Sequence, residues 1–237
     1  MALTRLDKFL ADAGIASRKE LKSIIKSGRV SVDGTAIKKS ETKIDPELAE
    51  VRLDGKLIAL KKYRSFMLNK PCGVVTATED KEQKTVMDLL PPELKHLGLF
   101  PVGRLDKDTS GLLLLTNDGD FAHKVISPKF SVEKCYYAEV DGEPDEEDEQ
   151  AFKEGITLKD GYKCLPAELI RLGKNRCRVI LKEGKYHQVR RMLASRGKPV
   201  IKLKRLSIGT LALYEDLAEG QCIELDDEDL CRVFSTV

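Results

Sequence analysis

A run of charged residues stands directly before an apolar segment in the stretch GRLDKDTSGLLLLTNDG, residues 103–119. Two carboxylates, Asp106 and Asp108, precede the aliphatic run Leu112–Leu115. Because a continuous aliphatic run is typical of a strand buried on both faces, Asp106 is expected near the end of a buried sheet. A carboxylate in that position can act as a nucleophile or a general base if a cation keeps it ionised.

Asp108 is the rival carboxylate in this loop. Its place before Thr109 is better suited to capping a tight turn, which we expect Thr109, Ser110 and Gly111 to form. The alternative interpretation is an ordinary polar turn between two strands. Residue spacing alone leaves both interpretations open.

A second segment with possible binding chemistry is GKYHQVRRMLASRGKPVIKLKRL, residues 184–206, which holds eight Lys and Arg and no acidic residue. Helical spacing places His187, Arg190 and Arg191 within one turn of each other. Cations can bind phosphates and flat rings can stack on bases, so the composition of the segment favours an RNA-binding surface over a merely solvated helix surface. The residues expected to contact RNA here are Lys185, Tyr186, His187, Gln188 and Arg191.

Positive charge is concentrated in the first quarter of the chain. Residues 1–64 hold 15 Lys and Arg against 9 Asp and Glu, whereas residues 65–237 hold 26 against 30. The net charge of +2 over 237 residues therefore hides two parts of opposite sign. This asymmetry predicts a small basic module, residues 1–60, a linker, residues 61–65, and a second domain, residues 66–237.

The first module has the patterns of two short helices and a small sheet. Apolar spacing predicts a helix within residues 4–13, and Ser17 with Glu20 forms the capping box of a second helix. Asp-Gly turns at 33–34 and 54–55 predict hairpins. The basic residues cluster on the second helix and the turn after it: Arg18, Lys19, Lys22, Lys26 and Arg29. This face suits a phosphate backbone, and a solvated helix surface is the alternative.

Strands and helices intermingle without regular alternation in the rest of the chain, which predicts a mixed α+β domain with a largely antiparallel sheet. Strand patterns occur at 66–69, 73–77, 99–105, 111–116, 135–140, 166–172, 176–182 and 199–214. Helical patterns occur at 85–90, 119–126, 145–154 and 187–196. Acidic runs at 139–149 and 215–229 are expected to be solvated faces or helix starts.

Several classes of protein are disfavoured by the composition. No apolar run approaches the roughly 20 residues that cross a bilayer, and the first stretch mixes charge with apolar residues, unlike a secretory signal. The six cysteines include no CxxC pair and only three histidines are present, which argues against a zinc site. We therefore expect a reduced cytoplasmic protein, and a monomer, because one chain supplies every expected part.

The segment GRLDKDTSGLLLLTND resembles the signature of the pseudouridine synthase family that modifies small-subunit and large-subunit ribosomal RNA. The resemblance extends through FMLNKPCGVVTAT, residues 66–78, EKCYYAEV, residues 133–140, EGKYHQVRRM, residues 183–192, and KRLSIG, residues 204–209. Residues 5–34 resemble the S-four-type RNA-binding domain. The resemblance implies site-specific isomerisation of a uridine in 16S (small-subunit) ribosomal RNA.

The resemblance also implies roles for individual residues. Asp106 looks like the catalytic aspartate of the family, and Tyr136 like the active-site tyrosine that stacks on the target base. Arg190 falls where the family keeps a basic residue paired with that aspartate. Arg104 is similar to an arginine that fills the space left by a flipped-out base. Because Tyr136 and Tyr137 are adjacent in a strand, only one of them can face the cleft.

Isomerising uridine needs neither redox chemistry nor phosphate transfer, so the resemblance implies no cofactor and no metal. The sequence agrees in lacking a nucleotide-binding loop and a dinucleotide fingerprint. The alternatives are the same reaction on 23S (large-subunit) ribosomal RNA and a non-catalytic RNA-binding factor in ribosome assembly. A glycosidase-like hydrolase would need a second carboxylate across the substrate, and Asp108 is too close in sequence to supply it.

Overall fold

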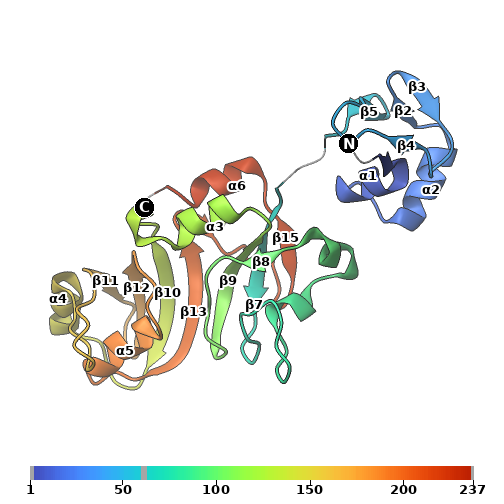
Figure 1. Cartoon of the computed structure of the whole chain (residues 1–237). Helices are drawn as coiled ribbons and strands as arrows, with labels where there is room; N and C mark the ends of the chain where they lie inside the picture. The colour runs from blue at the N-terminus through green and yellow to red at the C-terminus, as the bar shows by residue number, and fades with distance from the viewer. Residues whose placement is uncertain (1–2, 60–62, 236–237) are drawn as a thin grey trace. The chain divides into compact units, whose positions relative to one another are not determined.

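The computed structural model describes residues 3–59 and 63–235 (Figure 1). The chain divides into two compact units, Met1–Tyr63 and Arg64–Val237. Residues 61 and 62 of the expected linker lie outside the described residues. Arg64 and Ser65, its last two residues, belong to the second unit, because the first strand of that unit begins at Ser65 and the Arg64 side chain is buried against it.

The first unit contains two helices and two small sheets. Its elements are β1 (Thr4–Arg5), α1 (Leu6–Asp12), α2 (Arg18–Lys26), β2 (Val30–Val32), β3 (Thr35–Ile37), β4 (Lys43–Ile44), β5 (Val51–Leu53) and β6 (Lys56–Leu57). The sheets have the orders β3-β2-β5-β6 and β1-β4. The predicted capping box is present, since the Ser17 hydroxyl accepts from the Glu20 amide and the Glu20 carboxylate accepts from the Ser17 amide. The small core lies between the helices and the sheet: Leu6, Phe9, Leu10, Leu21, Ile25, Val30, Ile44 and Val51.

The second unit is built on a long twisted sheet with the path order β11-β12-β10-β13-β9-β7-β15. Its strands are β7 (Ser65–Lys70), β8 (Phe100–Pro101), β9 (Thr109–Thr116), β10 (Lys134–Val140), β11 (Glu168–Arg171), β12 (Arg176–Leu181), β13 (Val200–Ile208), β14 (Leu211–Ala212) and β15 (Cys222–Glu224). Its helices are η1 (Val86–Leu89), η2 (Pro92–Leu97), α3 (Gly119–Ile126), η3 (Pro128–Phe130), α4 (Glu146–Glu154), α5 (Gln188–Ser195) and α6 (Asp227–Arg232). The mixed, mostly antiparallel architecture predicted from the sequence is confirmed.

Helices cover the sheet at different places on its two faces (Figure 1). On one face, α4 and α5 pack over β10, β12 and β13 through Phe152 and Met192, while η1 packs over β7 and β9 through Val86. On the opposite face, α3 packs over β7 and β9 through Phe121 and Val125. No helix in the described parts of the chain is long and apolar enough to cross a membrane.

The central junction of the sheet is the parallel pairing of β9 with β13. Gly111 lies opposite Arg205 there, and a Cβ at Gly111 would stand 2.2 Å from the Arg205 carbonyl oxygen. Gly111 also has a φ of +103°, a region that side chains rarely adopt. A glycine is therefore required at this point of the strand. All eight residues of β9 are buried, as the aliphatic run predicted.

Some predicted elements differ in the structure. Residues 73–77 form no strand, because only Val75 makes an isolated bridge, to Thr85. The pattern at 99–105 yields only the two-residue strand β8, and the pattern at 85–90 yields a 3-10 helix rather than an α-helix. Both acidic runs contain helix starts, since Asp145 caps α4 and Asp226 caps α6.

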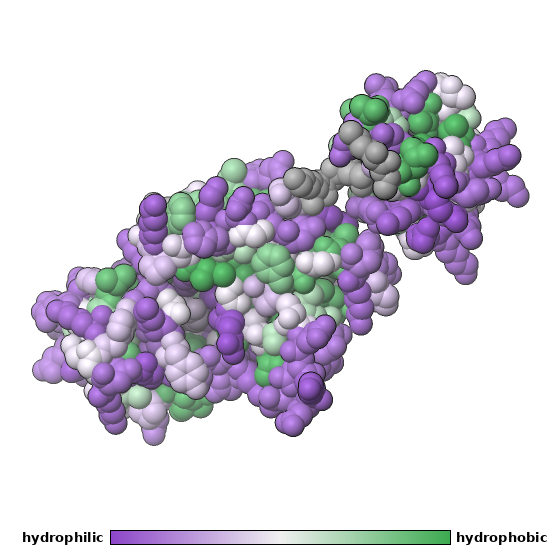
Figure 2. Space-filling view, in the orientation of Figure 1, coloured by the Kyte–Doolittle hydropathy of each residue, from purple (hydrophilic) through white to green (hydrophobic). Residues whose placement is uncertain are grey.

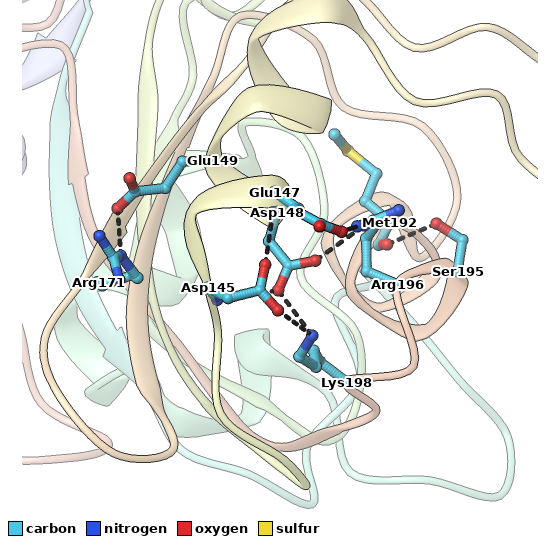
Figure 3. Close-up of polar contacts among 9 residues, drawn as sticks. All are labelled: Asp145, Glu147, Asp148, Glu149, Arg171, Met192, Ser195, Arg196 and Lys198. Atoms are coloured by element: carbon cyan, nitrogen blue, oxygen red, sulfur yellow. Dashed lines mark hydrogen bonds and ion pairs between the residues drawn. The ribbon is translucent and has the colours of Figure 1, made fainter.

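Asp148 joins α4 to the chain just after α5 (Figure 3). Its side chain is 1% exposed and lies 2.8 Å from both Arg196 Nε and Lys198 Nζ. Burial alone would raise the pKa of Asp148, but hydrogen bonds from Lys198 and Arg196 outweigh burial and hold the pKa below its ordinary value of 3.8. The first acidic run thus ties two helices together as well as facing solvent.

We predict that Asp148→Asn lowers the free energy of unfolding by about 3 kcal/mol at pH 7, because two cations lose their buried carboxylate. A carboxyl with a lowered pKa stabilises the fold above its ordinary pKa of 3.8, and this contribution is lost as the pH falls through the folded value. Urea unfolding should therefore show a gap between variant and wild type that closes below about pH 4. Glu147→Gln is the control, because Glu147 is 89% exposed and lies 3.8 Å from Arg196. A gap that is constant with pH would contradict the prediction.

Candidate active site

The loop between β8 and β9 is held in place by a buried lysine, Lys70. The Lys70 ammonium donates to the carbonyl oxygens of Asp106 at 3.0 Å, Thr109 at 2.9 Å and Pro71 at 3.1 Å. The Lys70 side chain is fully buried, and burial lowers its pKa. These carbonyl oxygens replace the water that the ammonium loses, so the lysine fixes the backbone on both sides of the turn.

The turn lies earlier in the chain than predicted, at residues 106–109 instead of 109–111. The Thr109 amide donates to the Asp106 carbonyl at 3.1 Å, which places Lys107 and Asp108 at the centre of the turn. Thr109 already belongs to β9, together with Ser110 and Gly111. The prediction of a turn at 109–111 is wrong, because these residues pair in parallel with β13.

The two carboxylates of the loop have different partners. Asp106 is 28% exposed, and its Oδ1 lies 3.4 Å from Nε2 of His187. Asp108 is 67% exposed, and its Oδ2 lies 3.0 Å from Nη2 of Arg190. Arg190 also donates to the Asp108 carbonyl at 3.1 Å. The expected pairing of Arg190 with Asp106 is therefore not found, because the guanidinium lies at the Asp108 end of the turn.

His187 is held beside Asp106 by an unusual backbone. It precedes α5 with a φ of 48° and a ψ of 33°, in the left-handed region, and no side chain caps the helix. The Tyr186 ring stacks on the His187 ring, with centroids 3.9 Å apart, and is 76% exposed. The exposed Tyr186 ring therefore covers one face of the imidazole that lies beside the carboxylate.

Tyr136 and Asp106 share a small cavity of about 70 Å³ with Thr109 and His187. The Arg205 guanidinium lies 6.0 Å from the centre of the Tyr136 ring, with Nη1 3.5 Å from the hydroxyl. Thr109 Oγ1 is buried beside this cavity and has no hydrogen-bond partner among the residues that the structure describes. The cavity therefore brings a carboxylate and a phenol together at close range.

Tyr137, the neighbour of Tyr136, faces the opposite side of the sheet. Its hydroxyl donates to Glu139 at 2.9 Å. Alternation along β10 thus assigns the cavity to Tyr136 and solves the choice that the sequence left open.

A larger cleft of about 1010 Å³ opens onto the same aspartate. Arg104 is exposed and lines both this cleft and the small cavity. Lys185 and Tyr186 line the cleft, and the Lys185 ammonium lies 5.2 Å from the ring centre of Tyr162. A polymer could lie in the cleft while one of its groups entered the cavity.

The basic segment 184–206 is not a continuous stripe of free charge. Arg191 pairs with Asp160 at 2.5 Å, and Arg196 and Lys198 pair with Asp148. The sequence prediction missed these pairs, because every carboxylate in them comes from outside the segment. The interpretation of the whole segment as a free positive surface is therefore wrong.

Gln188, which we expected to contact RNA, is only 4% exposed. Its amide donates to the buried carboxylate of Glu183 at 2.6 Å, and its oxygen accepts from the Lys185 amide at 2.9 Å. Glu183 also accepts from the Tyr162 hydroxyl at 2.6 Å, which raises the pKa of Tyr162 to about 12. Gln188 and Glu183 therefore brace the loop that carries Tyr186 and His187.

Two of the five basic residues predicted on the first unit are already paired. Arg18 lies 3.3 Å from the buried carboxylate of Asp7, and Arg29 pairs with Asp54. The remaining three are exposed on α2 and form no ion pair within the described part of the chain: Lys19, Lys22 and Lys26. The free positive charge of this face is thus carried by three lysines one turn apart.

Lys70 and Arg205 are the important residues that sequence reasoning did not single out. The available signal for Lys70 was a lysine that ends the apolar strand SFMLNK just before a proline. Arg205 was counted only as one cation of a basic run. Nothing in the sequence shows that it is 4% exposed and donates to the Leu112 carbonyl at 2.7 Å.

Comparison with known proteins gives two family matches. Residues 64–195 match the RNA pseudouridylate synthase family, and residues 4–48 match the S4 domain. The chain is similar over 95% of its length to an uncharacterized RNA pseudouridine synthase of Bacillus subtilis, with 44% identity and 96% of that protein covered.

Two relatives differ in the ribosomal subunit that their names carry. Ribosomal small subunit pseudouridine synthase A of Yersinia pestis is 38% identical, with 97% of each chain covered. Ribosomal large subunit pseudouridine synthase B of Bacillus subtilis is also 38% identical, over 98% of this chain and 96% of that protein. Among solved structures, a pseudouridylate synthase matches with a TM-score of 0.69, 34% identity and coverage of 97% and 99%.

We predict that Lys70→Met speeds amide hydrogen exchange at residues 105–109, because the carbonyl oxygens of the turn lose their buried donor. The free energy of unfolding should fall by about 1–3 kcal/mol. The matched control is Lys134→Met, since Lys134 donates instead to the carbonyl oxygens of Val125 at 3.2 Å and Val132 at 2.8 Å. That variant should loosen residues 125–132 and leave the turn unchanged. Equal exchange of the turn in both variants would refute the anchoring role.

Proposed function

The chain belongs to the RNA pseudouridylate synthase family, and from this we propose that it isomerises one uridine of 16S (small-subunit) ribosomal RNA, with Asp106 as the essential catalytic residue. The observation that carries the proposal is the placement of the Asp106 carboxylate in one cavity with Tyr136, at the floor of an open cleft. The choice of the small subunit rests on the segments KPCGVVTAT and LFPVGRLDKDTSG. The alternative substrate is 23S (large-subunit) ribosomal RNA, because a relative named for that subunit is equally identical.

The reaction exchanges one bond for another. The bond between N1 of uracil and C1′ of the ribose breaks, the ring turns, and C5 bonds to the same C1′. A proton leaves C5 and N1 gains one, so no electrons are transferred to or from another molecule. A single carboxylate, with a neighbouring group that accepts a proton, is therefore sufficient chemistry.

The residues of the cavity suit these steps. Asp106 would attack as a nucleophile or remove a proton, and Tyr136 would stack on the uracil ring and lie within reach of the departing proton. His187, 3.4 Å from Asp106, replaces Arg190 as the nearest basic side chain to this carboxylate. Arg190 would act indirectly, because its ion pair with Asp108 holds the turn that carries Asp106.

The target base must leave its stack before it reaches the cavity, at a cost of a few kcal/mol, about the energy of unstacking one base. Arg104 lines both the small cavity and the cleft, and its side chain would fill the space that the base leaves in the RNA stack. RNA contacts of Lys185, Tyr186 and the lysines of α2 would offset the cost, whereas Arg191 would have to leave Asp160 before it could contact a phosphate. We propose that the S4 unit, residues 1–60, binds RNA backbone while residues 66–237 perform the reaction.

We further propose that the protein acts as a monomer in the cytoplasm and uses no cofactor or metal. The second candidate function is an RNA-binding assembly factor without catalysis. An S4 domain alone would support that role equally well. The arrangement of Asp106 with Tyr136 favours the enzyme, because binding RNA does not require a carboxylate in the cleft.

We predict that cells lacking the protein, and cells that express only Asp106→Asn, lose pseudouridine at the same single site of 16S ribosomal RNA. The reason is that the variant keeps the RNA-binding surfaces but loses the reacting carboxylate. The measurement is a chemical map of pseudouridine in both large ribosomal RNAs. Loss of a 23S site would correct the substrate, and normal modification by Asp106→Asn would remove the aspartate from the mechanism.

We also predict that replacing Lys19, Lys22 and Lys26 by Ala weakens RNA binding and lowers its salt dependence. Three lost phosphate contacts should reduce the slope of log K against log salt by about 2 to 3, since each contact contributes about 0.7 to 0.9. Filter binding of ribosomal RNA at several salt concentrations measures the slope. The control is Arg29→Ala, because Asp54 already neutralises Arg29. An unchanged slope would show that the α2 lysines are only solvated.

A further inference from the structure

The cleft above Asp106 has a second wall that the basic segment 184–206 does not supply. Lys185 and Tyr186 line it from that segment, whereas Ile126, Pro101 and Gly103 line it from another part of the chain. Ile126 is the last residue of α3, and its Cγ1 lies 3.6 Å from the position that a Cβ at Gly103 would occupy. The end of α3 is therefore packed directly on the loop that leads to Asp106.

This second wall continues outward through exposed apolar side chains. Ile126 is 49% exposed and Phe130, in η3, is 44% exposed. The Phe130 ring meets the ring of His123 edge to face, with centroids 6.5 Å apart and planes at 84°. The view in Figure 2 shows apolar surface gathered over the middle of the second unit. Exposed apolar side chains beside a functional cleft mark a binding surface more often than isolated ones do.

The charge of this segment has one sign. Residues 121–132, FAHKVISPKFSV, contain Lys124 and Lys129 and no acidic residue. Both lysines are exposed, and neither forms an ion pair among the described residues. The nearest acidic residues in the chain are Asp120, at the start of α3, and Glu133, which pairs with Lys182 at 3.4 Å. The segment therefore keeps its positive charge on both sides of Ile126, its residue that lines the cleft.

We propose that the end of α3 and η3, His123–Phe130, is a second RNA-contact wall that holds the single-stranded nucleotides next to the target uridine. In this arrangement Ile126 and Phe130 pack against bases, while Lys124 and Lys129 contact phosphates. Apolar or aromatic side chains interleaved with cations are the chemistry that unstacked RNA requires. The proposal rests on the proposed function, because it assigns the cleft to RNA, and it adds a surface outside the catalytic residues.

The shape of the cleft supports RNA as the occupant. The wall is continuous with the cavity that contains Asp106 and Tyr136, through Gly103 and Arg104. The stacked rings of Tyr186 and His187 line the same cleft. A strand lying in the cleft would therefore meet the apolar side chain of Ile126, the stacked rings and the lining cations Arg104 and Lys185, and Phe130 lies four residues beyond Ile126 in the chain.

The test is binding of ribosomal RNA, extracted from cells that lack the protein, to the full chain carrying Asp106→Asn. In this background, Ile126→Ser with Phe130→Ser should weaken binding about tenfold, because bases lose their packing surface. The matched control is Ile223→Ser with Leu165→Ser, whose side chains are 44% and 47% exposed and do not line the cleft. Circular dichroism and thermal unfolding check that both double variants remain folded.

The lysines give a second readout of a different kind. Lys124→Ala with Lys129→Ala should lower the salt slope of binding by about 1.4, the value for two single-strand phosphate contacts. Lys95→Ala with Lys153→Ala is the control, because these lysines are exposed on η2 and α4, outside the proposed wall His123–Phe130. The proposal would be overturned if the wall variants and the control variants had equal affinity for RNA and equal salt slopes. It would also be overturned if the Asp106→Asn protein did not bind ribosomal RNA at all. The two proposals can fail separately. If cells that lack the protein still make every pseudouridine normally while the wall variants lose affinity for RNA, the proposed reaction is wrong and the proposed RNA-contact surface is supported.

Discussion

The parallel pairing of β9 with β13 is the constraint on which the active-site geometry depends. Gly111 allows the backbones of β9 and β13 to approach each other at Arg205. This close approach brings together the two parts of the sheet that supply the side chains of the cavity. The Asp106 turn precedes β9, and Tyr136 lies on β10, the next strand beyond β13. Without close approach at Gly111, the carboxylate and the phenol would belong to separate halves of the sheet.

Cations with protein partners position the backbone and the helices of the second unit. Lys70 replaces water with carbonyl oxygens from the turn, and Arg205 donates to the carbonyl of Leu112. Arg196 and Lys198 are neutralised by Asp148 on another helix. Much of the positive charge in this domain is thus used to position backbone and helices, and the cations free to meet RNA are fewer than the sequence count indicates.

Local patterns predicted the local structure well. The aliphatic run Leu112–Leu115 became a fully buried strand, and the Ser17 and Glu20 pair formed its capping box, because both depend on neighbours a few residues away. Alternation along β10 also limited the cavity to one of two tyrosines. The partners of Arg190 and Gln188 could not be predicted, because Asp108 and Glu183 reach them only through the fold of the loops. The role of Lys70 as a hydrogen-bond donor could not be predicted for the same reason, because its acceptors in the Asp106 turn lie in a distant part of the chain.

The order of the strands has a consequence for how the chain acquires its shape during synthesis. β9 must wait for β13, about 90 residues later, and β7 pairs at the sheet edge with β15, near the end of the chain. In the first unit, in contrast, the sheet β3-β2-β5-β6 pairs strands that are close in sequence, and even the pair β1 with β4 joins residues less than half as far apart as β9 and β13. High contact order slows folding, so a nascent chain would complete the first unit early and leave the start of β9, Thr109–Gly111, without its β13 partner until translation is almost finished. The catalytic cavity is therefore among the last features to form, and the exposed strand is the point where chaperones or premature aggregation would act on unfinished chains.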